Sequence, residues 1–153
     1  MRTDLKLGNI FPDFELPNQD NQTIRLSKFR GQKNVVLYFY PKDFTSGCTK
    51  ESCQFQSEWK AFEGLNAVVL GVSSDSPSSH AKFRAAHGLK FDLLADEKNE
   101  ARKLYGAASL GGILPGRVTF VIDKQGNVAH VFSSQTSPLE HVTVARQALE
   151  KLR

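Results

Sequence analysis

Both cysteines of this chain lie in one short segment, where four residues separate Cys48 from Cys53. An apolar run at 35–40 precedes them and is typical of a strand that is covered on both faces. Pro41 ends this strand, and a short polar turn leads to Cys48, where a helix is expected to begin. Free backbone N–H groups and a partial positive charge at a helix N-terminus favour a thiolate over a thiol. The position of Cys48 at the expected start of a helix therefore predicts a reactive, ionised sulfur.

Polar groups near Cys48 could bind a small substrate and stabilise negative charge on it. Thr45 or Ser46 is expected to be the N-cap of the helix, and the Thr45 hydroxyl could bind a substrate oxygen. Gly47 allows close approach to the backbone, where its N–H group and that of Cys48 can donate. Arg117, at the entry to a predicted central strand, could supply a fixed cation, although on its own it is more simply a salt-bridge partner.

The elements that position Cys48 can be predicted from the apolar pattern that follows it. Phe55, Trp59 and Phe62 recur at helical spacing and predict a helix over about 47–62, with the three rings packed in the core. A second apolar run at 67–72 predicts another buried strand. Strand, helix and strand in this order form a βαβ unit, so the two strands should be parallel.

The rest of the chain alternates between strand and helix patterns. Ser76-Pro77 and Ser137-Pro138 each place a cap before a proline at the first helical position, and Glu140 completes a capping box with Ser137. In chain order the patterns predict a hairpin of 14–16 with 23–26, a helical turn at 27–31, a helix to Gly88, a strand at 91–94, a helix at 97–105, a loop at 107–116, a hairpin of 118–122 with 128–132, and a last helix presenting Val142, Ala145, Leu149 and Leu152 on one side.

This element order predicts an α/β fold formed by a single domain over residues 1–153. A central mixed β-sheet with helices on both faces and an N-terminal β-hairpin accommodates the elements best. A thioredoxin-like arrangement is the natural candidate for such a sheet.

Composition excludes several classes of protein. The chain has 153 residues with 40% hydrophobic content, and its net charge of +4 comes from interspersed acidic and basic residues, so no basic stripe suggests nucleic-acid binding. No apolar run approaches the roughly 20 residues of a membrane span. The first residues lack the apolar core of a signal peptide, so we expect a cytoplasmic protein. Two cysteines are too few for a secreted disulfide scaffold.

The segment around Cys48 resembles the active site of the peroxiredoxins. The pattern Pro41-x-x-x-Thr45-x-x-Cys48, directly after an apolar strand, is the motif of that family. The longer string is similar to the peroxiredoxin Q branch, also called bacterioferritin comigratory protein, in Phe39-Tyr40-Pro41-Lys42-Asp43, Thr45, Gly47-Cys48-Thr49 and Cys53. Arg117, within Pro115-Gly116-Arg117-Val118-Thr119-Phe120, matches the distal active-site arginine of the family. The likeness extends from Gly8-x-x-x-Pro12-x-Phe14 to the final helix.

The resemblance implies a thiol peroxidase that reduces hydrogen peroxide and organic hydroperoxides. Cys48 would be the peroxidatic cysteine, which becomes a sulfenic acid. Thr45 and Arg117, with Gly47, would bind and polarise the peroxide, and Pro41 would shield the sulfenate from over-oxidation. Ser46 departs from the pattern, since many members of the branch carry proline there; because that position supplies backbone geometry, we expect tuning rather than loss of activity.

Cys53 matches the resolving cysteine of the branch, which would form an intramolecular disulfide with Cys48 that thioredoxin reduces. On an intact helix, residues five apart have Cα atoms roughly 8–9 Å apart. A disulfide requires a separation within about 7 Å. The first turns of the helix must therefore unwind in each catalytic cycle.

Other functions fit parts of the same pattern. A thioredoxin-type dithiol oxidoreductase usually carries a tighter C-x-x-C spacing, and a non-enzymatic chaperone or interaction domain could use the same fold. A zinc site is not expected, because two cysteines supply two ligands and His80, His87, His130 and His141 are scattered and expected on the surface. The sequence thus predicts no cofactor and no metal, and the resemblance implies a monomer.

Overall fold

A five-stranded mixed sheet forms the centre of the protein in the computed structural model, which describes residues 7–109 and 114–152. The strand order is β5-β4-β3-β8-β9. β3 is parallel to β4, and β4 to β5, whereas β8 is antiparallel to both β3 and β9. The strands are β3 Asn34–Phe39, β4 Ala67–Ser73, β5 Asp92–Ala95, β8 Val118–Ile122 and β9 Val128–Ser133. The parallel pairing expected from the βαβ pattern is confirmed.

Side chains of β3 alternate between two hydrophobic layers, because successive residues of a strand point to opposite faces. Val35, Leu37 and Phe39 belong to the core on one face of the sheet. Val36 and Tyr38 belong to the core on the other face. All five side chains are buried, which explains why the sequence shows a continuous apolar run here instead of an alternating pattern.

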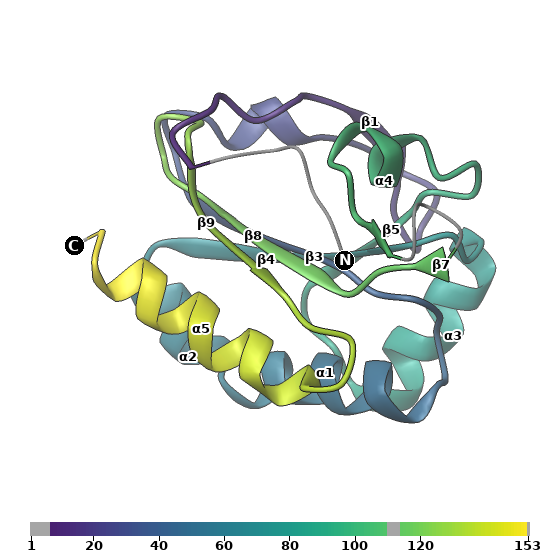
Figure 1. Ribbon diagram of the computed structural model, residues 1–153. Helices are drawn as coiled ribbons and strands as arrows, with labels where there is room; N and C mark the ends of the chain where they lie inside the picture. Colours follow the sequence, from purple (N-terminus) through teal and green to yellow (C-terminus); the bar gives the residue numbers. More distant parts are fainter. Residues whose placement is uncertain (1–6, 110–113, 153) are drawn as a thin grey trace.

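Helices cover both faces of this sheet (Figure 1). One face packs against Phe55, Phe62, Phe83 and Val142, one side chain from each of four helices. These helices are α1 Ser46–Ser57, α2 Trp59–Gly64, α3 Pro77–His87 and α5 Pro138–Glu150. The other face carries the shorter elements: β1 Glu15–Pro17 and β2 Thr23–Arg25, which form the expected hairpin, the 3-10 turn η1 Leu26–Phe29, and α4 Glu100–Leu104. None of the helices in the described ranges is long and apolar enough to cross a membrane.

The helix predicted over about 47–62 is interrupted at Glu58. The Ala61 N–H donates to the Glu58 carbonyl at 3.0 Å, a three-residue bond that tightens the backbone between α1 and α2. Phe55 and Phe62 are fully buried and Trp59 packs partly buried against them, so the apolar stripe is confirmed although the helix is not continuous.

Four other sequence expectations need correction. The helix predicted over 97–105 begins only at Glu100, with Asn99 as its N-cap residue. The Asp96 carboxylate accepts from the Ala101 and Arg102 N–H groups of its first turn at 3.1 and 2.9 Å. Ser137 makes no side-chain cap bond at the start of α5, so the capping box is absent.

The third correction concerns Leu152, which lies beyond α5 and is 40% exposed. Finally, the segment expected to be a loop contains a short two-stranded ladder of β6 Ala108–Ser109 with β7 Leu114–Pro115, and positions 110–113 lie outside the described residues.

Candidate active site

Cys48 lies in the first turn of α1 and is 1% exposed. Thr45 is the N-cap residue, and its carbonyl accepts the first bond of the helix from the Thr49 N–H at 2.9 Å. The sulfur is therefore at the end of the helix where backbone N–H groups lack intrahelical acceptors, as the sequence predicts. Both cysteines are in the free form, and Cys53 is partly buried further along the same helix.

Arg117 contacts the sulfur directly. Its Nη2 donates to the Cys48 Sγ at 3.4 Å, and its Nη1 donates to Glu51 Oε1 at 2.8 Å. Gln135 fixes the base of the arginine, because its side-chain oxygen accepts from the Arg117 backbone N–H and its carbonyl from Nε at 3.4 Å. The prediction that Arg117 lies beside Cys48 is confirmed.

The charge on Arg117 is well retained despite burial. Burial lowers the pKa of Arg117, but the negative charges of Glu51 and Cys48 outweigh this effect, so the net pKa lies above its ordinary value. The guanidinium is thus a permanent cation that bridges a carboxyl group and a sulfur. Such a cation stabilises negative charge on sulfur and on any oxygen bound between them.

Glu51 completes this arrangement, although no pattern in the sequence predicts its role. It lies one turn after Cys48 on the same face of α1 and is fully buried. Burial raises the pKa of Glu51 to about 8, although the charge and the hydrogen bonds of Arg117 act in the opposite direction. Among the described residues no group hydrogen-bonds its second oxygen, Oε2. Its spacing of three residues from Cys48 was the available signal.

His141 and His80 are both fully buried, so the expectation of surface histidines is wrong for these two. His141 lies on α5, with Nδ1 2.8 Å from the Thr119 hydroxyl and 3.7 Å from Glu51 Oε2. Burial and, to a smaller extent, the charge of Arg117 lower the pKa of His141 to about 4, although the bond to the Ser134 carbonyl acts in the opposite direction. His141 is therefore neutral and adds no positive charge next to Arg117, whose guanidinium contacts Glu51 and Cys48.

Gly47 has a steric role that the sequence did not reveal. A Cβ atom added at this position would lie 3.1 Å from Nη2 of Arg117. This distance is shorter than an ordinary van der Waals contact, so a side chain here would push the guanidinium away from its present place. The absence of a side chain at Gly47 thus lets the helix start pack closely against Arg117.

Thr45 and Pro41 lie in the turn that leads to α1. The Thr45 hydroxyl donates to the Lys42 carbonyl at 2.8 Å and is exposed, so it supports the turn and does not cap the helix by its side chain. Its acceptor capacity remains open to solvent. Pro41 is partly buried directly after β3.

Cys53 shares a helix with Cys48, and burial raises the pKa of its thiol. α1 runs without interruption from Ser46 to Ser57, so both cysteines are held at helical spacing. At that spacing the Cα atoms are too far apart for a disulfide, as calculated from helix geometry.

Comparisons with known proteins give a consistent result. The family model described as AhpC/TSA family matches residues 7–131. Peroxiredoxin Q, chloroplastic, from Populus jackii is 45% identical over 146 residues, which are 95% of this chain and 68% of that protein. The crystal structure of peroxidoxin BcpB from Mycobacterium tuberculosis has a TM-score of 0.90 and 37% identity, over 97% of this chain and 99% of that one. A structure of the Xanthomonas campestris bacterioferritin comigratory protein, a protein with alkyl peroxide reduction activity, has a TM-score of 0.83 and 27% identity over 99% of each chain.

Proposed function

This chain belongs to the AhpC/TSA family, in its peroxiredoxin Q branch, and is a thiol peroxidase; on that basis we propose that Cys48 is the sulfur that attacks the peroxide. The observation that carries the assignment is the contact of Arg117 with both the Cys48 Sγ and Glu51. Because this cation is fixed on two sides, its position needs no rearrangement when charge develops during the reaction.

In the proposed first step the Cys48 thiolate attacks one oxygen of the peroxide. The S–O bond forms as the O–O bond breaks, so sulfur is oxidised to a sulfenate. The proton of the attacked oxygen passes to the other oxygen, which leaves as water or an alcohol, and a proton from solvent converts the sulfenate to the sulfenic acid. Arg117 would stabilise the departing oxygen, and the Gly47 and Cys48 N–H groups would orient the peroxide. The Thr45 hydroxyl oxygen would accept a hydrogen bond from the peroxide O–H, and Pro41 would limit access of a second peroxide.

Cys53 would resolve the sulfenic acid in a second step. Its sulfur displaces the hydroxyl of the sulfenic acid, and a disulfide and water are formed without any further oxidant. Since α1 holds the two cysteines at helical spacing, the first turns of α1 must unwind for this step. Unwinding also exposes Cys53 to water and removes the burial that raises the pKa of its thiol.

Members of this family act on peroxides and are recycled by thioredoxin-like dithiol reductants, and we propose thioredoxin itself for this chain. Organic hydroperoxides are proposed as substrates beside hydrogen peroxide, because the similar Xanthomonas campestris protein is known for alkyl peroxide reduction. A monomeric state and a cytoplasmic location stay predictions, and the Populus jackii relative is a chloroplastic protein.

Steady-state peroxide consumption tests the assignment of the two cysteines. With a dithiol reductant and thioredoxin present, we expect turnover by the wild type, none by Cys48→Ser, and a strong loss by Cys53→Ser. In a single turnover without reductant, Cys53→Ser should still consume one equivalent of peroxide. Consumption by Cys48→Ser at the wild-type rate would disprove the role of Cys48.

A further inference from the structure

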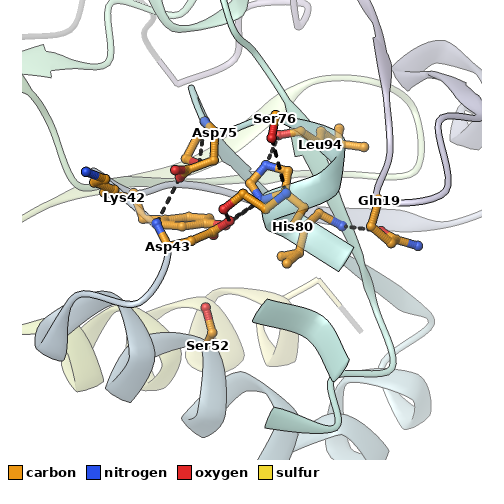
Figure 2. A network of polar contacts seen from close by, with 12 residues as sticks. Gln19, Lys42, Asp43, Ser52, Asp75, Ser76, His80 and Leu94 are labelled. Atoms are coloured by element: carbon orange, nitrogen blue, oxygen red, sulfur yellow. Dashed lines mark hydrogen bonds and ion pairs between the residues drawn. The ribbon is translucent and has the colours of Figure 1, made fainter. Parts of the chain in front are cut away.

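The turn between β3 and α1 is anchored by a second buried polar cluster, formed by Asp43, Asp75 and His80 (Figure 2). Asp43 and His80 are 3% and 0% exposed, and the ligand-type atoms of the three residues all lie within 4.8 Å of one another. Ligand atoms this close together could bind a metal ion, unless hydrogen bonds within the protein already use them.

Hydrogen bonds within the protein already use these atoms. Asp43 Oδ1 accepts from the Tyr40 hydroxyl at 2.6 Å, and Oδ2 accepts from the Ser79 hydroxyl at 2.9 Å and lies 2.7 Å from His80 Nδ1. Asp75 Oδ2 accepts from the Asp43 backbone N–H at 2.8 Å. The donors around both carboxylates are therefore protein groups, and the cluster is a hydrogen-bonded clamp instead of an open metal cage.

Each ring nitrogen of His80 contacts a partner in this clamp. Nε2 lies 2.9 Å from the Leu94 carbonyl, which can only accept, so Nε2 carries a hydrogen. Nδ1 faces Asp43, whose carboxylate already accepts from two hydroxyl groups. Through these two contacts His80 links Asp43 to β5.

The clamp fixes both the side chain and the backbone of the turn just before Cys48. Arg102 Nη2 additionally donates to the Tyr40 carbonyl at 2.7 Å. The next residue after Asp43 is Phe44, which has a φ of 65° and is 55% exposed. A left-handed conformation is unfavourable for a bulky residue, and it persists only where the surroundings enforce it. Directly before Phe44 the Asp43 N–H is bound by Asp75, and the Phe44 ring packs edge-on against Phe83.

We propose that Asp43 and His80 are positioning residues that set the balance between the intact and the unwound α1. This inference rests on the proposed roles of Cys48 and Cys53. With the clamp closed, α1 begins at Ser46 and Cys48 is held against Arg117, which favours attack on the peroxide. The same anchoring opposes the unwinding that brings Cys53 to Cys48.

The two chemical steps should therefore respond in opposite directions when the clamp is weakened. A shift in the population of the unwound state lowers the fraction of molecules that can attack the peroxide and raises the fraction that can form the disulfide. A residue with a purely structural role would not produce this opposition, because general loss of packing would slow the first step without speeding the second.

Rapid mixing with peroxide, followed by acid quench and mass analysis, measures the two steps separately. In Asp43→Ala we expect sulfenic acid formation to slow by about tenfold and disulfide formation to accelerate by about tenfold, with less conversion of Cys48 to sulfinic acid at high peroxide. Asp43→Asn should shift both rates in the same directions as Asp43→Ala but by a smaller factor, because its oxygen still accepts from Tyr40 while its amide nitrogen cannot accept from Ser79. His130→Gln, on β9, is the matched histidine control for His80→Gln.

The outcome distinguishes this inference from the proposed function. Equal rates in Asp43→Ala and wild type, or a decrease in both rates, would overturn the clamp proposal while leaving Cys48 and Cys53 in their roles. If Asp43→Ala does not fold, Ser79→Ala can be used, because it removes one of the bonds to Asp43 Oδ2. It should slow sulfenic acid formation and accelerate disulfide formation, each by a smaller factor than Asp43→Ala. Unchanged rates in Ser79→Ala would then overturn it.

Discussion

Replacement of Arg117 by glutamine removes the cation that contacts the proposed attacking sulfur. Nη2 lies 3.4 Å from the Cys48 Sγ. At an effective dielectric constant of about 20, a unit charge at that distance stabilises a thiolate by about 5 kcal/mol. The helix N–H groups and water that enters the site replace part of this stabilisation of the thiolate. The expected loss of rate is therefore similar to the loss on removing one oxyanion-hole donor. We therefore expect the rate constant for oxidation of Cys48 to fall by about 10²- to 10³-fold.

The same substitution also affects stability, through Glu51. In Arg117→Gln this buried carboxyl group loses the cation that donates to it at 2.8 Å, and Oε2 has no hydrogen-bond partner among the described residues. Glu51→Gln added to Arg117→Gln removes that buried acid and should restore stability without restoring the rate. The double-mutant cycle thereby separates the contribution of Arg117 to folding from its contribution to catalysis.

Stopped-flow measurement of Cys48 oxidation, with thermal unfolding of each variant in parallel, provides the test. Arg146→Gln is a matched control, because it removes an arginine that pairs with Glu58 at the end of α1 instead of contacting Cys48. The control should retain the wild-type oxidation rate. An Arg117→Gln protein that is folded and reacts within twofold of the wild type would refute the electrostatic reasoning.

Three further predictions concern Glu51, Gly47 and Cys53. Burial raises the pKa of Glu51 from 4.5 to about 8, so between these pH values the folded state retains a proton that the unfolded state has released. The stability of the wild type relative to Glu51→Gln should therefore fall by up to about 5 kcal/mol as the pH rises from 4.5 to 8. Urea unfolding measures this difference. Gly47→Ala should slow peroxide attack by about tenfold while the protein stays folded, because its Cβ would lie 3.1 Å from Nη2 of Arg117; an unchanged stopped-flow rate would contradict this steric argument. Disulfide formation should accelerate as the pH rises through the ordinary thiol pKa of about 8.5, since unwinding removes the burial that raises the pKa of Cys53 and only the thiolate attacks. A resolution rate independent of pH between about 7 and about 9.5 would contradict this.

Patterns confined to one element could be predicted from the sequence. The run at 35–40 indicates a buried strand because both of its faces are covered, and the rings of Phe55 and Phe62 lie in the core as their helical spacing indicates. Ser76 caps α3 with its hydroxyl, which accepts from the Ser79 N–H at 3.1 Å. Arg117 was placed beside Cys48 from the resemblance to the peroxiredoxins, and the structure confirms that contact.

Features that depend on distant partners could not be predicted. A glutamate such as Glu51 in a helix is usually solvated, and here it is buried because Arg117, 66 positions away, lies over it. His80 appears in a polar stretch, and its burial requires Asp43 from a turn on another element. Asp96 shortens α4 because its carboxylate, outside the helix, takes the first N–H groups. In each case a long-range contact or a side chain outside the element overrides the local pattern.

The mass of the protein under non-reducing conditions, after one equivalent of peroxide, tests the proposed roles of the two cysteines most directly. We expect the wild type to lose two hydrogen atoms and peptide mapping to link Cys48 to Cys53. Cys53→Ser should instead gain one oxygen on Cys48, and Cys48→Ser should keep its mass. Oxidation of Cys48→Ser as fast as the wild type, or a wild type that gains oxygen without forming the internal disulfide, would contradict the proposed mechanism.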